Sequence, residues 1–553
     1  MQLYFSSGIV SLVGLSVVLI VVIWLAQLIG RGLFIRFKFL AMRSRGLPVP
    51  EPYSFLYGHI PLMKSLKEGL PKDAHDTYVH RKLTMNWPKY FPHRKSCPPV
   101  IYLDLWPLTS QPFIYATSPE ACFQLTQQTA QPRHSMFSWA LFPVTGGKDL
   151  ISMDIPTHRI WRSRLNPGFS LKNLLSQTPI LIEEVGIFVQ QLKEQAGTDG
   201  NFGDLFQLFD RTVALTFDII TRVSLDLRVR EQTQGPTPIL KALRALIRHV
   251  KGPTIWSELE RWTPSYRRDV ALNTKILRDS LLPQIKSRLQ PDASSEKTVI
   301  DLAVKEYKTE SGNENQQPNP DFVDMVISQL KLFMLAGHDT TAQAICWVLY
   351  EITKSPEVLR QLRAEHDEVL GSDVQLAAQI LSAEPHKLNS LRYTTAVVKE
   401  SLRLHPLGST HRRGSRGFSF VCDGTTYPSD GAVIWTSPTA IHLRADLWPR
   451  VAEFLPERFL VAEGHALRPA RNAWRPFELG NTRCIGEELA MIEMKLVLAL
   501  TMRELDFCFD WEGWNVLQGR TTPPDSVGGE HIYRVGGGIG SVKDKLPTRV
   551  KLR

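Results

Sequence analysis

One cysteine of the chain lies in a loop whose composition suits thiolate chemistry. Cys484 is flanked by glycines in the segment Phe477–Gly486, FELGNTRCIG. An amphipathic helix is predicted to begin near Glu487, and the free amides and dipole at a helix N-terminus favour a thiolate. Position alone leaves three interpretations open, namely a catalytic nucleophile, a redox sensor or an inert core residue.

A second candidate site lies within the apolar segment 321–353, which contains no proline and is predicted to be one helix through the middle of the molecule. Ala336–Thr341, AGHDTT, places a small pair before an acid and two hydroxyls. Glycine weakens helix interiors and a threonine hydroxyl can bond to a preceding carbonyl, so a local kink is expected. A packing kink without function is the alternative.

Taken together, the motifs resemble those of the cytochrome P-450 family. Phe477–Gly486 fits its heme-binding loop, and Ala336–Thr341 fits its oxygen-activating helix motif. Glu400–Arg403 resembles its Glu-x-x-Arg, and Pro456–Phe459 resembles the segment that completes its charged triad. The resemblance covers nearly the whole chain after the N-terminal segment. It implies a mainly α fold with small β-sheets, a helix-rich prism around heme b.

The resemblance implies roles for the residues of the cysteine loop. Cys484 would be the axial thiolate ligand of the heme iron, and such a ligand favours O–O cleavage. Gly480 and Gly486 would let the backbone turn tightly beside the porphyrin, and Phe477 would shield the sulfur.

Two further groups follow from the resemblance. Glu400, Arg403 and Arg458 would form a buried triad that maintains the fold and the heme pocket. Asp339 and Thr340 would be the catalytic pair that delivers protons to the oxygen site.

The heme propionates need cationic partners. The resemblance offers four positions for them: His158, Arg162, His411 or its neighbour Arg412, and Arg483. The arginine that the family commonly has two residues before the cysteine is Thr482 here. Arg483 therefore either reaches the propionate from the neighbouring position or points elsewhere.

The N-terminus is predicted to be a membrane anchor. Residues 1–30 carry no charged side chain, and 8–29 is long enough to cross a bilayer as a helix. Basic residues follow directly, at Arg31, Arg36, Lys38, Arg43 and Arg45. We expect a lumenal N-terminus and span (1–30), a basic segment with a proline hinge (31–52) and a cytosolic catalytic domain (53–553), in the endoplasmic reticulum membrane. A removed signal or a buried helix is the alternative.

Composition excludes other classes. The 553 residues carry 65 Lys and Arg against 55 Asp and Glu, a net charge of +10, and 43% are hydrophobic, which excludes wholesale disorder. The basic residues beside the predicted span account for half of that surplus. They point to membrane lipid and not to nucleic acid. The six cysteines show no paired spacing, which disfavours a disulfide scaffold.

The remaining pattern predicts a helix-rich body. A hairpin is expected at Pro99–Thr117, and strands are expected at Gly414–Thr436 and in the tail beyond Asp506. Helices are expected near 171–196, 203–228, 236–250, 266–290, 321–353, 356–370, 387–404 and 485–505.

Electrons must come from another protein, because no flavin- or nicotinamide-binding region remains in the chain. The resemblance implies O₂ and an NADPH-dependent diflavin reductase, which would meet basic residues around the cysteine loop: Arg468, Arg471, Arg475 and Arg483. The segments that contact substrate in the family hold apolar side chains here: Phe137, Trp139, Phe142, Ile255 and Trp256. They suggest a small apolar substrate, and they are equally compatible with core packing.

The chain is similar to fungal secondary-metabolite oxidases of the sterigmatocystin type, which suggests a polyketide or related natural product. We expect a heme-thiolate monooxygenase. One alternative is a heme-thiolate isomerase or dehydratase, which Asp339 and Thr340 disfavour. The other is a non-catalytic heme-binding membrane protein.

Overall fold

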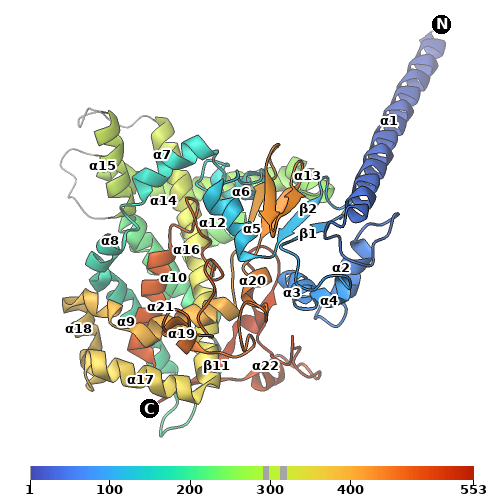
Figure 1. Ribbon diagram of the computed structural model, residues 1–553. Coiled ribbons are helices and arrows are strands. Elements are labelled where there is room, and N and C mark those ends of the chain that lie inside the picture. Colours follow the sequence, from blue (N-terminus) through green and yellow to red (C-terminus); the bar gives the residue numbers. More distant parts are fainter. Residues whose placement is uncertain (1, 290–297, 312–319) are drawn as a thin grey trace.

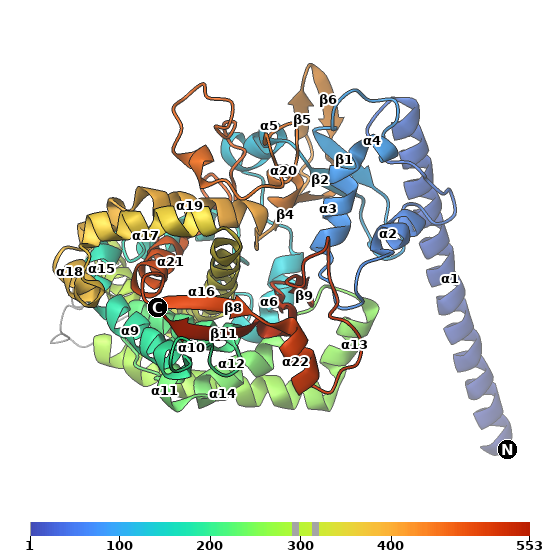
Figure 2. The same cartoon turned by 90° about the horizontal axis from the view of Figure 1, so that it is seen from below.

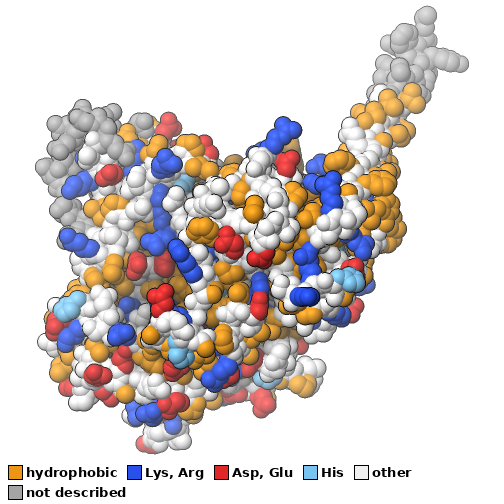
Figure 3. Space-filling view, viewed as in Figure 1, with side chains coloured by type: hydrophobic (Ala, Val, Ile, Leu, Met, Phe, Trp, Pro, Cys, Tyr) orange, Lys and Arg blue, Asp and Glu red, His pale blue; other side chains and the backbone are white. Residues whose placement is uncertain are grey.

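A single helix leaves the body at the N-terminus, as Figures 1 and 2 both show. The computed structural model describes residues 2–289, 298–311 and 320–553. The helix, α1 (Gln2–Ser44), has 43 residues and so extends beyond the predicted span 8–29 at both ends. It is long and apolar enough to cross a membrane. Figure 3 shows hydrophobic side chains along it.

The segment before residue 53 packs against the body. Ile35, Phe39 and Met42, in the last turns of α1, are buried in a cluster with strand residues of the first sheet. In the proline segment 47–52, the Pro48 carbonyl accepts a hydrogen bond from the Tyr102 amide at 2.9 Å. The segment predicted to be a hinge is therefore tied to the body by backbone hydrogen bonds.

The body is mainly helical, as predicted. Its helices are α2 (Ile60–Lys67), α3 (Thr77–Met85), α4 (Trp87–Tyr90), α5 (Pro119–Phe123), α6 (Met136–Thr145), α7 (Ile155–Leu165), α8 (Leu171–Ser176), α9 (Thr178–Gln195), α10 (Leu208–Leu225), α11 (Glu231–Gln234), α12 (Pro238–Ile247), α13 (Ile255–Trp262), α14 (Pro264–Arg288), α15 (Val299–Ser311), α16 (Pro320–Lys354), α17 (Pro356–Leu370), α18 (Ala377–Ala383), α19 (Arg392–Leu404), α20 (Thr439–His442), α21 (Glu487–Thr501) and α22 (Trp511–Leu517).

Each predicted helix corresponds to a helix of the structure, with two divisions. The helix expected at 387–404 is a 3-10 turn, Pro385–Asn389, followed by α19 from Arg392. The helix expected at 171–196 is two helices, α8 and α9, which meet at Gln177. Pro179 lies in the first turn of α9. Proline has no amide hydrogen to donate and disfavours helical backbone before it, so a helix tends to begin at such a residue and not to continue through it.

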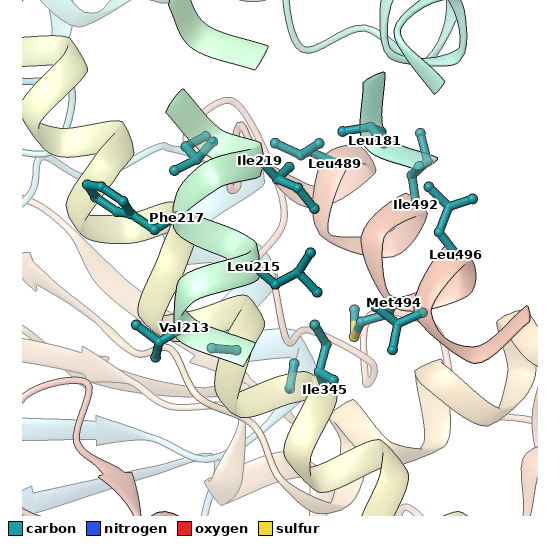
Figure 4. Close-up of a cluster of buried hydrophobic side chains, with 14 of the residues drawn as sticks. Leu181, Val213, Leu215, Phe217, Ile219, Ile345, Leu489, Ile492, Met494 and Leu496 are labelled. Atoms are coloured by element: carbon teal, nitrogen blue, oxygen red, sulfur yellow. The ribbon is translucent and has the colours of Figure 1, made fainter. Parts of the chain in front are cut away.

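The central helix α16 is continuous from Pro320 to Lys354. Most of its side chains between Val326 and Ile352 are buried, because α10, α14, α19 and α21 pack around it. Figure 4 shows the core where side chains of α10, α16 and α21 meet, among them Leu215, Ile345 and Met494. The kink expected at Ala336–Thr341 does not interrupt the helix.

The strands form small sheets. They are β1 (Val100–Leu103), β2 (Phe113–Ala116), β3 (Phe206–Gln207), β4 (Thr410–Arg413), β5 (Ser419–Cys422), β6 (Thr425–Pro428), β7 (Val433–Thr436), β8 (Leu505–Phe509), β9 (Arg534–Val535), β10 (Ser541–Val542) and β11 (Pro547–Leu552). The largest has the order β1-β2-β7-β4. The predicted hairpin is confirmed, because β1 and β2 pair antiparallel with Ile101 opposite Tyr115.

Candidate functional site

The cysteine loop is held in shape by its own backbone. The Cys484 amide donates a hydrogen bond to the Phe477 carbonyl at 2.8 Å. Gly480 has φ +90°, and a side chain there would meet the Thr126 carbonyl oxygen at 2.2 Å. Glycine is therefore required at this position.

Gly486 has a different role from Gly480. Its φ is −89°, and an added side chain would lie at an ordinary 4.0 Å from the Cys484 sulfur. Ile485 and Gly486 form a turn that leads into α21, but the backbone angles of Gly486 do not require a glycine. Gly486 is the N-cap of α21, and its amide, with the guanidinium groups of Arg162 and Arg133, opposes the rise that burial causes in the pKa of the Cys484 thiol.

Cys484 lines a cavity of about 800 Å³. Of the six cysteines, all of them in the described part of the chain, Cys484 alone is exposed. The cavity wall comes from the cysteine loop, α7, the 130–133 segment and β4. Its volume is in the range of small-molecule and cofactor sites.

Basic side chains gather on this cavity wall. We call Arg133, His158, Arg162 and Arg412 the cavity cluster. Arg133 donates to the Leu150 carbonyl at 2.7 Å and to the Thr482 carbonyl at 3.2 Å. Arg412 donates to the Thr482 hydroxyl. The position where the family has its arginine is thus an acceptor for two arginines from elsewhere in the chain.

Burial and neighbouring cations lower the pKa values of the cavity cluster, and nearby acidic groups only partly offset this. Burial lowers the pKa of Arg133 to about 9, and the neighbouring Arg412 adds to the effect. Burial, together with Arg133, Arg162 and Arg412, lowers the pKa of His158 to about 4. Within the described chain, His158 Nε2 and Arg412 Nε are buried without a hydrogen-bond partner. An anion in the cavity would offset these costs.

Arg162 and Arg483 are connected through the cysteine loop. Arg162 donates to the Arg483 carbonyl at 2.8 Å and to the Asn166 side chain at 2.6 Å. The Arg483 side chain lines the cavity but is 56% exposed, 4.0 Å from Glu487. It contributes mainly to the mouth of the cavity.

His411 does not line this cavity, and its neighbour Arg412 does. Successive residues of a strand point to opposite faces, and the pairing of β4 with β7 turns Arg412 toward the cysteine loop. His411 lies on the other face, stacked on Trp435 at 5.1 Å. Of the two candidates that the sequence offered, Arg412 is the one at the cavity.

The predicted basic surface needs one correction. Arg468, Arg471 and Arg483 are exposed, but Arg475 is only 2% exposed. Arg475 forms an ion pair with Glu478 inside the loop and donates to the Thr126 hydroxyl at 2.8 Å. On the face in Figure 3, Lys and Arg side chains are mixed with Asp and Glu.

The charged triad comes together as predicted. Arg403 makes hydrogen bonds of 2.8 Å to both carboxylate oxygens of Glu400, and Arg458 donates to Glu400 at 3.1 Å. All three side chains are fully buried. Arg403 also donates to the backbone carbonyls of His442, Val451 and Glu453.

Asp339 and Thr340 lie in the middle of α16 and are not part of the cavity wall around Cys484. The Thr340 hydroxyl donates to the Ala336 carbonyl at 2.7 Å, the expected back-bond. Asp339 Oδ1 lies 3.2 Å from His338 Nε2. Burial raises the pKa of Asp339, but His338 and Arg244 outweigh it and hold the pKa below its ordinary value. The pair is thus a hydroxyl beside a carboxylate.

The apolar residues that the sequence suggested as substrate contacts lie in different surroundings. Phe137 packs on His411 at 5.5 Å, whereas the Arg261 guanidinium stacks 3.5 Å above the Trp139 ring. Phe142 and Trp256 are 55% and 78% exposed. The side chain of Ile255 lies outside the described residues.

Comparison with known proteins identifies the family. The model of the Cytochrome P450 family matches residues 101–514. The chain belongs to the cytochrome P450 family. It is 34% identical to cytochrome P450 monooxygenase polC of Polytolypa hystricis, over 92% of this chain and 90% of the relative. It is 32% identical to acrF of Aspergillus aculeatus, over 73% and 83%. It is 26% identical to ptmG of Penicillium ochrochloron, over 94% and 92%.

Members of the cytochrome P450 family are heme-thiolate oxidoreductases that use O₂ and a redox partner. The site fits heme b on its own evidence. One exposed thiol faces the cavity, and the cluster with orphaned nitrogen atoms suits the two propionates. No group of three or more His, Cys, Asp and Glu side chains in the described residues could hold a bare metal ion. A porphyrin brings four further nitrogen ligands, so one thiolate suffices.

Sequence reasoning missed Arg133 as a cavity residue. Arg133 is distant in sequence from every motif. An isolated antiparallel β-bridge between Arg133 and Arg412 brings it to the cavity. A basic residue directly after Pro132 was the only local signal.

Proposed function

We propose that this cytochrome P450 is a membrane-anchored monooxygenase that inserts one oxygen atom of O₂ into a small apolar natural product. Its electrons would come from NADPH through a separate diflavin reductase. The observation that carries the proposal is the pairing of one exposed thiol with a cationic cavity wall. The fungal relatives named as monooxygenases support the reaction class.

Each residue has a defined part in this proposal. Bound heme would activate O₂, with Cys484 as the thiolate that favours O–O cleavage. Arg133, His158, Arg162 and Arg412 would hold the propionates by charge-assisted hydrogen bonds, in place of the arginine that Thr482 replaces. Phe477 and Gly480 would shape the loop around the sulfur, and Gly486 would direct its amide at the sulfur.

Asp339 and Thr340 would deliver protons at the distal side. The Thr340 hydroxyl can turn from the Ala336 carbonyl to a water. The ionised Asp339 would accept a proton from solvent and then release it to that water, returning to the carboxylate. This pair favours a monooxygenase over a heme-thiolate isomerase or dehydratase, which needs no protons from solvent. Glu400, Arg403 and Arg458 would maintain the fold below the heme and take no part in turnover.

The anchor supports a membrane location. Residues 1–30 would place the N-terminus in the lumen of the endoplasmic reticulum and the catalytic domain, 53–553, in the cytosol. The basic residues after the span would contact anionic lipid. The exposed Arg468, Arg471 and Arg483 would meet the acidic face of the reductase.

The deciding experiment is the reduced carbon monoxide difference spectrum of the full chain. We expect a Soret band at about 450 nm, the signature of thiolate ligation. It should vanish in Cys484→Ala and remain in the control Cys508→Ala. A band at about 420 nm, or no heme in folded wild-type protein, would refute the proposal. NADPH consumption that needs the reductase separates the monooxygenase from the isomerase and from a non-catalytic heme protein.

A further inference from the structure

A small cleft lies between α3, α16, β9 and the segment that follows α19, and it shares no wall residue with the cavity at Cys484. Its volume is about 30 Å³, which suits one water molecule or an ion of similar size. Hydrogen-bond donors reach its wall from two of these elements, Tyr78 and Arg81 from α3 and Arg534 from β9. Much of the remaining wall is apolar.

Arg534 is buried at this cleft without a carboxylate partner. The residue is 6% exposed, and its Nε and Nη2 donate to carbonyls of its own loop, Ile539 at 2.6 Å and Gly538 at 2.9 Å. Its third nitrogen, Nη1, has no hydrogen-bond partner among the described residues. Burial lowers the pKa of Arg534 to about 10, and the opposing influence comes from the Tyr78 hydroxyl and not from a carboxylate.

Tyr78 and Arg81 add further donors beside Arg534. The Tyr78 hydroxyl accepts a hydrogen bond from the Arg534 amide at 3.0 Å. Burial raises the pKa of Tyr78, and the charges of Arg81 and Arg534 both oppose that rise. Arg81 donates its Nε to the Met85 sulfur at 3.3 Å. Within the described part of the chain, its other two nitrogens and the Tyr78 proton have no acceptor.

The acids around the cleft form ion pairs with other cations. Each has its own partner: Asp73 with Lys543 at 2.8 Å, Asp76 with Lys67 at 2.7 Å, and Glu351 with His405 at 2.7 Å. Burial also lowers the pKa of Arg81, and no carboxylate opposes this shift. A buried cation without a countercharge destabilises a fold. Two guanidinium groups at one cleft therefore favour an anion there.

We propose that this cleft binds a small monovalent anion, chloride, held by Arg81, Arg534 and the Tyr78 hydroxyl. Chloride can accept hydrogen bonds from all three groups and supplies a countercharge, so its contacts are charge-assisted. A water molecule fits the same volume but brings no countercharge. The inference does not depend on the proposed function, because the cleft lies apart from Cys484.

The site would stabilise a contact between distant parts of the chain. β9 meets the segment before α3 through the bridge between Ala74 and Val535, and the His75 amide donates to the Arg534 carbonyl at 2.9 Å. Figure 2 shows α3 and β9 next to each other. A bound chloride would reduce the repulsion between Arg81 and Arg534 where these two segments meet.

The test is the chloride NMR line width during a chloride titration of the heme-loaded full chain in detergent, at constant ionic strength kept with gluconate. We expect saturable broadening with wild-type protein. Arg81→Met and Tyr78→Phe should each bind chloride about tenfold more weakly, because each loses a hydrogen bond to a charged group. Lys82→Met is the matched control. It removes a cation from the next position of α3, outside the cleft wall, and should leave binding unchanged.

The results that would overturn the proposal are distinct from those expected. They are the absence of saturable broadening in wild-type protein, unchanged binding in both cleft variants, and an equal loss in Lys82→Met. Displacement of chloride by phosphate more readily than by bromide would also overturn it, because the site would then favour a larger anion. Tyr78→Phe keeps the ring, so it decides the question even if Arg81→Met does not fold.

Discussion

Two groups of buried arginines differ in what balances their charge. In the charged triad, Arg403 and Arg458 both bond to the Glu400 carboxylate, and all three side chains are fully buried. In the cavity cluster, the hydrogen bonds of Arg133 and Arg412 go to carbonyl and hydroxyl oxygens. Neither forms an ion pair among the described residues.

The difference indicates what each group is for. A buried charge is tolerated when an opposite charge and hydrogen bonds compensate its desolvation. In the triad the Glu400 carboxylate supplies that charge to both guanidinium groups, and only Arg458 Nη1 has no hydrogen-bond partner among the described residues. We therefore assign the triad to the fold. The cavity cluster does not, and it faces a cavity beside Cys484. An anionic ligand would complete it, and under the proposed function the heme propionates would be that ligand.

The largest effect is expected from breaking the triad. Glu400→Gln leaves two buried guanidinium groups without a countercharge, which should lower the free energy of unfolding by about 3–5 kcal/mol. Urea unfolding measures it. The control is Glu453→Gln at the exposed Arg450–Glu453 pair, whose side chains are 56% and 50% exposed. That variant should lose less than about 1 kcal/mol. Equal losses would contradict the assignment of the triad to the fold.

The second-largest effect is a pH dependence of the free energy of unfolding, and it comes from His442 beside the triad. His442 Nε2 accepts a hydrogen bond from the Arg475 amide at 2.8 Å, and burial and Arg403 lower its pKa to about 3. The unfolded histidine binds protons from a pH of about 6.5, so stability is present above that pH and is lost as the pH falls toward 3.

The expected slope can be isolated in one variant. In His442→Asn, which can still accept the Arg475 hydrogen bond, the unfolding free energy should fall less steeply between pH 6.5 and pH 3. Urea midpoints of both proteins across this range measure the difference. Parallel curves would show that another group is responsible.

The cavity cluster should respond in the opposite direction from the triad. Arg133→Met removes a half-buried cation that forms no ion pair among the described residues, so the heme-free protein should be unchanged or stabilised by about 1 kcal/mol. Heme affinity should fall about tenfold, because a charge-assisted hydrogen bond is lost. Heme titration and urea unfolding of the heme-free chain measure the two effects. Arg403→Met, the matched variant in the triad, should destabilise the heme-free chain. A loss of stability in Arg133→Met would contradict the comparison.

The same contrast shows what the sequence could predict. The cysteine loop and the Glu400–Arg403 pair were found because their members are close in sequence and their geometry is local. Arg458 was placed by its motif. Arg133 was not found, because a long-range bridge brings it to Arg412.

Two further points depend on contacts that the sequence does not show. The sequence offered His411 or its neighbour Arg412 at the cavity, and only the pairing with β7 decides which of them faces it. Arg475 was predicted to be at the surface, but its ion pair with Glu478 draws it into the loop. Alternation and charge are visible in a sequence, whereas register and burial depend on partners elsewhere in the chain.

The smallest loss in the free energy of unfolding is expected from losing a cation–π contact that solvent can reach. The Arg261 guanidinium of α13 stacks 3.5 Å above the Trp139 ring of α6, and Trp139 donates to Glu258 at 2.5 Å. Both side chains are half-exposed, and Arg261 also donates to the Trp139 carbonyl. The cation–π contact contributes about 0.5–1 kcal/mol and the hydrogen bond about as much, so Arg261→Ala should lower the unfolding free energy by about 1–2 kcal/mol. Because the contact joins two helices, α13 should become more sensitive to limited proteolysis, whereas Arg268→Ala, at an exposed residue of α14, should not have this effect. A loss as large as that of Glu400→Gln would mean that exposure does not separate the strong charge networks of this protein from the weak ones.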